Sequence, residues 1–179
     1  RKESELVAIG KIAKIGIDER IQSARFIGKK GYLVTFKQMD PLFTLDLANP
    51  EKPKLIGELK IPGYSSYLQP WGEDYLLAIG RDGSVSKTED GFEVGSLKGV
   101  QLSMFDVKDL KNPQQVHKVA IGDIGTTSEA ETSHKAFNFF EEEELLAVPI
   151  AIQDWMVYSN PGGPDSPADA LYGTPAQGA

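Results

Sequence analysis

The chain contains no cysteine among its 179 residues. This absence excludes disulfide bonds, thiolate catalysis and cysteine-ligated zinc sites. Long apolar runs are also missing, because the longest one, residues 145–152, is interrupted by Pro149. A membrane-spanning helix needs about 20 consecutive apolar residues, so we expect no membrane span within this chain.

Basic clusters are scarce as well. The chain has 19 Lys and Arg against 26 Asp and Glu, a net charge of -7, and no basic run longer than a pair such as Lys29–Lys30. Proteins that bind nucleic acids usually display a basic face, so we expect no nucleic-acid partner. No HExxH zinc motif, P-loop or dinucleotide fingerprint is present. The opening Arg1–Lys2–Glu3 has no starting methionine or signal peptide, and we expect the chain to be a piece of a longer protein.

One phrase occurs twice, as LFTLDLANPEKPKLIGELKI at residues 42–61 and LSMFDVKDLKNPQQVHKVAI at residues 102–121. Asp46 therefore matches Asp106, and Pro53 matches Pro113. Each copy is typical of a strand, a turn and a second strand. An Asp at the end of a strand accepts hydrogen bonds from backbone N–H groups in the turn, and Pro prevents the strand from continuing. We therefore interpret both Asp residues as turn caps rather than catalytic carboxylates.

A second repeated element has the pattern strand, polar turn, apolar strand. It occurs at residues 25–36, 67–80 and 134–150. The two elements together make a four-stranded unit with a pitch of about 40–45 residues, which is typical of propeller blades. The predicted fold is therefore all-β, a β-propeller fragment of about two and a half four-stranded blades. A β-sandwich is the alternative, because it also has short strands with regular turns.

This pattern defines the domain organisation. We assign residues 1–158 to a partial propeller domain, with blade units at about 21–61, 64–121 and 134–158, the last one incomplete. Residues 7–14 resemble the strand at 54–61 and are expected to be a leftover strand of a preceding blade. Residues of about 81–99 are extra and are expected to form a loop. Residues 159–179, with four Pro and four Gly, predict a loop or disordered tail.

Several pieces between Glu19 and Ile150 resemble a known family. They are, in order, ERIQSARFIGKKGYLVTFKQMDPLFTLDLANPEKPKLIGELKIPGYSSYLQP, LLAIGRD, LSMFDVKDLKNP and SHKAF. These pieces resemble secreted proteins with a C-terminal β-propeller domain distantly related to WD40 repeats. The phrase around Asp46 is also similar to LVIVD-type repeats of surface propellers. The resemblance implies a secreted or cell-surface protein whose remaining blades lie elsewhere in the parent protein, and it supplies no catalytic motif.

The extra residues invite a calcium interpretation. Oxygen-bearing side chains stand at EF-hand ligand positions, namely Asp82, Ser84, Ser86, Thr88, Asp90 and Glu93. Lys87, however, occupies the position of the sharp-turn glycine, and no helices flank the segment. We expect a solvated loop and no cofactor. Calcium held by Asp82, Asp90 and Glu93 remains the alternative.

The strongest signs of a binding site are aromatic. Tyr64, Tyr67 and Trp71 gather in the connection between the first two full units and in the strand that follows. Tyr and Trp suit interfaces, although packing between blades is the competing interpretation. The two histidines, His117 and His134, are expected to be structural or exposed, because no Gly-x-Ser-x-Gly elbow accompanies them.

The predicted function is a non-catalytic interaction or scaffold propeller that binds a protein or a glycan through its loop faces. The alternative is a hydrolase whose active site is assembled at the propeller channel from several blades. Carboxylates or histidines that converge in one channel pocket would favour the hydrolase. An aromatic, uncharged channel mouth would favour binding.

Overall fold

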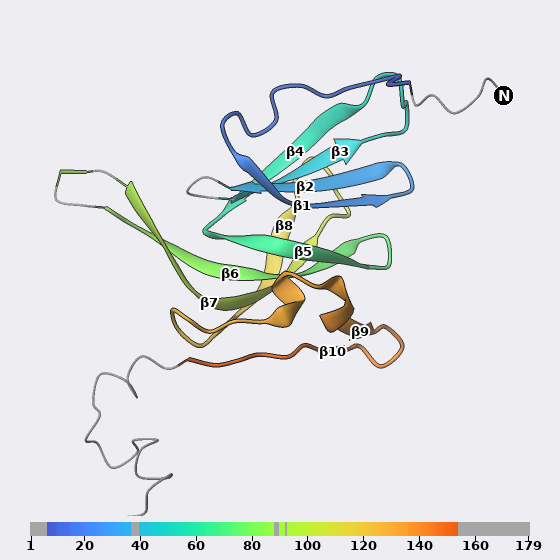
Figure 1. Ribbon diagram of the computed structural model, residues 1–179. Coiled ribbons are helices and arrows are strands. Elements are labelled where there is room, and N and C mark those ends of the chain that lie inside the picture. Colours follow the sequence, from blue (N-terminus) through green and yellow to red (C-terminus); the bar gives the residue numbers. More distant parts are fainter. Residues whose placement is uncertain (1–6, 37–39, 88–89, 92, 154–179) are drawn as a thin grey trace, which may run out of the picture.

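The computed structural model describes residues 7–36, 40–87, 90–91 and 93–153. Two antiparallel four-stranded sheets dominate this part of the chain, each with its strands in sequence order (Figure 1). The first sheet consists of β1 (Arg20–Ile27), β2 (Lys30–Phe36), β3 (Asp40–Asp46) and β4 (Lys54–Ile61). The second consists of β5 (Gly63–Trp71), β6 (Tyr75–Lys87), β7 (Glu93–Asp106) and β8 (Gln114–Ile121). The prediction of an all-β propeller fragment is thereby confirmed.

A smaller third unit follows β8. It contains two short 3-10 helices, η1 (Glu129–Glu131) and η2 (His134–Ala136), and a two-stranded hairpin of β9 (Asn138–Phe140) and β10 (Leu145–Ala147). The strand that we expected to begin at His134 begins at Asn138, because residues 134–136 form the turn of η2. The four glutamates from Glu141 to Glu144 form the turn of the hairpin.

Two hydrophobic cores hold the three units together. The first lies between the two four-stranded sheets and is built from Tyr32, Val34, Leu42, Ile61, Leu68, Leu76, Ala78, Phe105 and Val107. The second joins the second sheet to the third unit, through the buried residues Ile79, Val100, Ala130 and Phe137. The second sheet is therefore packed on both faces, as a blade between two neighbours must be.

The doubled phrase forms the same hairpin in both sheets. The Asp46 carboxylate accepts a hydrogen bond from the Ala48 backbone N–H at 2.9 Å, and Asp106 accepts one from Lys108 N–H at 3.0 Å. The two carboxylates thus close equivalent turns after β3 and β7. The prediction that they are turn caps is confirmed.

Two segments differ from expectation. The described part of the extra residues, about 81–99, is mostly strand, because β6 continues to Lys87 and β7 begins at Glu93. The two strands remain paired beyond the ends of β5 and β8 (Figure 1). The alternating sequence of this stretch explains the extended hairpin. Residues 7–14 form no strand. A fourth strand pairs with the third strand of its own blade, and the described part of the chain contains no such partner for them.

Residues 154–158 of the third unit and the tail at 159–179 lie outside the described residues. Within the residues that the structure describes, no helix is long and apolar enough to cross a membrane.

Candidate functional site

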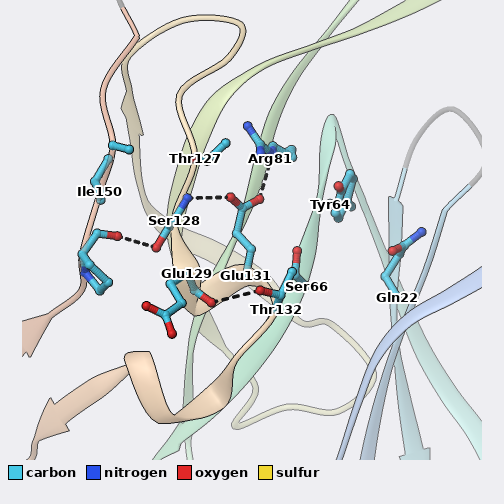
Figure 2. Close-up of a pocket in the computed structure, with 12 residues that line it drawn as sticks. Gln22, Tyr64, Ser66, Arg81, Thr127, Ser128, Glu129, Glu131, Thr132 and Ile150 are labelled. Atoms are coloured by element: carbon cyan, nitrogen blue, oxygen red, sulfur yellow. Dashed lines mark hydrogen bonds and ion pairs between the residues drawn. The ribbon is translucent and has the colours of Figure 1, made fainter.

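A cavity of about 820 Å³ opens where all three units meet (Figure 2). Its lining comes from β1, β5, β6 and two segments of the third unit. The lining residues are Gln22, Tyr64, Ser66, Arg81, Thr127, Ser128, Glu129, Glu131, Thr132, Pro149, Ile150 and Ala151. Since β1 and β5 are the first strands of their sheets, the cavity lies on the side where a propeller has its channel.

A capping box fixes one wall of the cavity. The Ser128 hydroxyl accepts a hydrogen bond from Ala130 N–H at 3.2 Å, and the Ser128 N–H donates to Glu131 Oε2 at 3.0 Å. This reciprocal arrangement satisfies backbone donors at the start of η1. It also gives the Glu131 side chain one defined orientation, towards β6.

Arg81 of β6 meets Glu131 at the floor of the cavity (Figure 2). Its Nε lies 2.7 Å from Glu131 Oε1, and its Nη1 donates to the Thr126 carbonyl at 2.5 Å. The two side chains are only 20% and 8% exposed, so the ion pair is poorly screened by water. Both oxygens of the Glu131 carboxylate therefore have partners within the protein.

The segment 149–151 forms the part of the lining next to the capping box (Figure 2). Thr127 and Ala151 exchange two backbone hydrogen bonds, at 3.0 and 2.8 Å. The Thr126 hydroxyl donates to the Gln153 carbonyl at 3.1 Å, and Ser128 Oγ donates to the Pro149 carbonyl at 2.6 Å. These bonds hold the segment against the turn before η1, so the cavity has a defined shape.

A second cavity of about 410 Å³ adjoins the first. Its lining is Arg25, Ser66, Tyr67, Ala130, Glu131, Thr132 and His134. Ser66, Glu131 and Thr132 line both cavities. The two hollows are therefore neighbouring parts of one concave region along β5.

The three predicted aromatic residues all lie on β5 but have different surroundings. Tyr64 lines the larger cavity, with its ring centroid 5.0 Å from that of Phe36. Tyr67 lines the smaller cavity, and its ring lies 5.1 Å from Phe137. Trp71 lines neither cavity, and its ring lies 5.5 Å from Phe139 of β9. Tyr64 and Tyr67 thus reach the concave region, whereas Trp71 packs between units. A role of these residues in binding a partner stays a prediction.

The candidate calcium ligands lie on the extended hairpin. Asp82 of β6 forms an ion pair with Lys118 of β8, with its Oδ1 2.5 Å from Nζ. Asp90 is exposed at the end of the hairpin, and Glu93 begins β7 opposite Lys87. Among the described His, Asp and Glu side chains, no group of three is arranged to hold a metal ion. The expectation of no cofactor, and its alternative of calcium held by Asp82, Asp90 and Glu93, both remain untested.

The two histidines lie on different elements. His117 is exposed on β8, the outer strand of the second sheet. His134 begins η2 and lines the smaller cavity. Ser128 is engaged by Ala130 and Pro149. Within the described residues, the imidazole of His134 has no hydrogen bond to a serine, so no Ser–His catalytic pair is formed.

Most residues of the cavity lining were not predicted from the sequence. Ser128-x-x-Glu131 has the spacing of a capping box and was a detectable signal for η1. Arg81 had no such signal, because its partners Thr126 and Glu131 become neighbours only when the third unit packs against the second sheet. Gln22 and Ser66 are single polar residues on strands and carry no motif.

Comparison with known proteins places the chain among propellers. The family described as Beta propeller domain matches residues 3–170. An uncharacterised protein of Archaeoglobus fulgidus is 39% identical over 161 residues, which cover 90% of this chain and 23% of that protein. The uncharacterised protein MJ1554 of Methanocaldococcus jannaschii is 39% identical over 147 residues, or 82% of this chain and 21% of its own length. The chain therefore spans less than a quarter of each relative. No solved structure matches it significantly.

Proposed function

The chain belongs to the β-propeller domain family, and from this premise we propose that it is a non-catalytic binding module that takes up a glycan or a protein segment in its channel-side cavity. The observation that carries the proposal is the cavity itself, with about 820 Å³ of volume and walls from all three units. Ligand sites typically have volumes of about 300–1,000 Å³ and a few fixed polar groups. Because its lining comes from three units, this cavity forms only when the units pack together.

The polar groups of the cavity favour binding over catalysis. Glu131 is engaged by Arg81 and the Ser128 N–H, and the Ser128 hydroxyl is engaged by Pro149 and Ala130. A nucleophile or a general base needs a free lone pair close to the reacting atom. These groups have a structural role instead, and they give the cavity rigid hydrogen-bonding walls.

A hydrolase is the second candidate, because two carboxylates line the same cavity. Glu129 and Glu131 both face it, and Glu129 is exposed. Most glycoside hydrolases use a pair of catalytic carboxylates. The engagement of Glu131 by Arg81 makes this the weaker candidate.

We also propose that the parent protein is exported or displayed at the cell surface. The resemblance of residues 19–150 to secreted propeller proteins supports this location. Fractionation of the source cells, with an antibody against this chain, tests it directly. Recovery of the protein only in the cytosolic fraction would overturn the proposal.

The binding role is tested by filling the cavity. Ser66 lines both hollows, so Ser66→Trp should block them. Ser86→Trp, on the exposed part of the extended hairpin, is the matched control. The chain and both variants are applied to arrays of oligosaccharides and of peptides. Binding that is lost in Ser66→Trp and kept in Ser86→Trp supports the proposal. Equal binding by both variants, or hydrolysis of an oligosaccharide that disappears in Glu129→Gln, would refute it.

A further inference from the structure

The two cavities form one groove along β5. Ser66, Glu131 and Thr132 belong to both linings, while Tyr64 lines one end and Tyr67 the other. Residues three apart on a strand are separated by roughly 10 Å. The groove is therefore long enough for more than one sugar ring or for a short peptide.

The charges of the groove are unequally compensated. Arg81 and Glu131 neutralise each other, which leaves Arg25 at one end of the groove and Glu129 at the other. Within the described residues, the Arg25 side chain has no hydrogen bond or ion pair, although it is half-buried. A guanidinium that is partly withdrawn from water and has no carboxylate partner can bind the carboxylate of a ligand.

The position of Arg25 directs its side chain into the groove. Arg25 lies opposite Tyr32 in the register of β1 and β2, and directly opposed residues point to the same face of a sheet. Tyr32 is fully buried in the core between the two sheets. The aliphatic stem of Arg25 thus begins at the edge of this core, and the side chain contributes to the lining of the smaller cavity, as His134 does.

We infer that this groove binds an acidic oligosaccharide and that Arg25 receives its carboxylate, an inference that rests on the proposed binding function. A guanidinium binds a carboxylate through two parallel N–H···O bonds. His134, in the same cavity, supplies a further donor. The ligand's acidic sugar lies at the Arg25 end, and the neutral part of the chain extends towards Tyr64.

The lining favours a sugar over a peptide. Gln22, Ser66 and Thr127 supply amide and hydroxyl groups that both donate and accept, and the Thr132 hydroxyl, which donates to the Glu129 carbonyl at 3.3 Å, can still accept. Such groups complement the many hydroxyls of an oligosaccharide. Tyr64 and Tyr67 also line the groove, and tyrosine combines an apolar ring with a polar hydroxyl. A protein partner is usually anchored by large apolar side chains in a desolvated pocket, and the aliphatic lining of the larger cavity is confined to Pro149, Ile150 and Ala151.

The test uses the whole chain and an array of uronic acid oligosaccharides, their methyl esters and Asp/Glu-rich peptides. Methyl esters keep the sugar and remove its charge, so each pair isolates the carboxylate. We expect uronic acid oligosaccharides to bind at least about tenfold more tightly than their esters, because charge-assisted hydrogen bonds are strong. Arg25→Gln should remove this preference. Arg20→Gln, at an exposed position of the same strand, should keep it.

The other outcomes separate this inference from the binding function. Equal binding of acids and esters, blocked by Ser66→Trp, would overturn the carboxylate site and leave the binding function in place. Binding of the acidic peptides alone would overturn the sugar ligand in the same way. A preference for acids that persists in Arg25→Gln would remove Arg25 from the site. Binding to none of the probes would count against the inference and the binding function together.

Discussion

Arg81 Nε lies 2.7 Å from Glu131 Oε1, and this contact joins the second four-stranded sheet to η1 of the third unit. The Nη1 of the same guanidinium donates to Thr126, and the second oxygen of the carboxylate accepts from Ser128 N–H. One ion pair therefore connects three backbone segments at the floor of the cavity. The shape of the groove depends on it.

The first prediction concerns this ion pair. Glu131→Gln should lower the free energy of unfolding by about 2 kcal/mol, because hydrogen bonds to charged groups contribute roughly 1.5–3 kcal/mol and Arg81 would lose its charged partner. Glu58→Gln makes the same change in an exposed pair with Lys60, where the side chains are 40% and 64% exposed. It should cost less than about 0.5 kcal/mol. Urea unfolding measures both, and equal effects of the two substitutions would contradict the importance of the Arg81 contact.

The second prediction concerns the contact between the two sheets at Gly57 of β4. A Cβ at this position would collide with the carbonyl oxygen of Leu110 and with Thr44 Oγ1, and Thr44 Oγ1 itself donates to Leu110 O at 2.5 Å. Gly57→Ala should therefore destabilise the protein by about 1–3 kcal/mol through overpacking.

The repeat provides the control for Gly57. Sixty residues later the equivalent position is His117, which is exposed on β8. His117→Ala should change the stability by less than about 0.5 kcal/mol. Thermal unfolding of both variants checks the pair, and a harmless Gly57→Ala would show that the two sheets are not packed as closely as the structure has them.

The features that could be predicted from the sequence are those that depend on residues close together in the chain. The hairpins β3–β4 and β7–β8 follow from alternating apolar residues and from turns closed by Asp46 and Asp106, all within about twenty residues of each other. The contact of Arg81 with Glu131 joins residues fifty positions apart and depends on how one unit packs against the next. Strand periodicity contains no information on that packing. The cavity was therefore not predictable, although two of the aromatic residues near it were identified.

The extension of the hairpin of β6 and β7 was not predicted from the sequence for a different reason. Its length and its Asp, Ser and Gly residues predict a loop, whereas the alternation of Ser84, Val85 and Ser86 is compatible with a strand. Cross-strand pairing decides the outcome, since Ser84 lies opposite Ser96 with their Oγ atoms 2.8 Å apart. A repeat search could not reveal this, because the other units have no counterpart.

The third prediction concerns calcium at this hairpin. Lys118 Nζ lies 2.5 Å from Asp82 Oδ1, so a cation bound by Asp82 would have to displace an ammonium group. We expect calorimetric titration with Ca²⁺ to give no binding heat that depends on Asp82. Asp82→Ala and Asp90→Ala should therefore give the same titration as the unchanged chain. Saturable binding that is abolished by Asp82→Ala alone would establish the calcium site and displace the structural role of the carboxylate.

The last prediction concerns Tyr32, which is fully buried between the two sheets. Burial and, second, the charge of Asp74 raise the pKa of the Tyr32 hydroxyl to about 12, whereas an unfolded tyrosine has a pKa of about 10. Below about pH 10 both states are protonated, so the contribution to stability is fully present. Between about pH 10 and 12 only the unfolded state releases its proton, and the free energy of unfolding falls by up to about 1.4 kcal/mol per pH unit.

Tyr32→Phe should remove this part of the alkaline loss. The hydroxyl has no hydrogen-bond partner among the described residues, so its removal at neutral pH should change the stability by less than about 1 kcal/mol. Tyr75→Phe, at a side chain 37% exposed, should keep the alkaline slope of the unchanged protein. Urea unfolding at a series of pH values compares the three proteins. An identical slope for Tyr32→Phe and the unchanged protein would mean that the Tyr32 hydroxyl reaches water in the folded state, which would contradict the close packing of β2 against the second sheet.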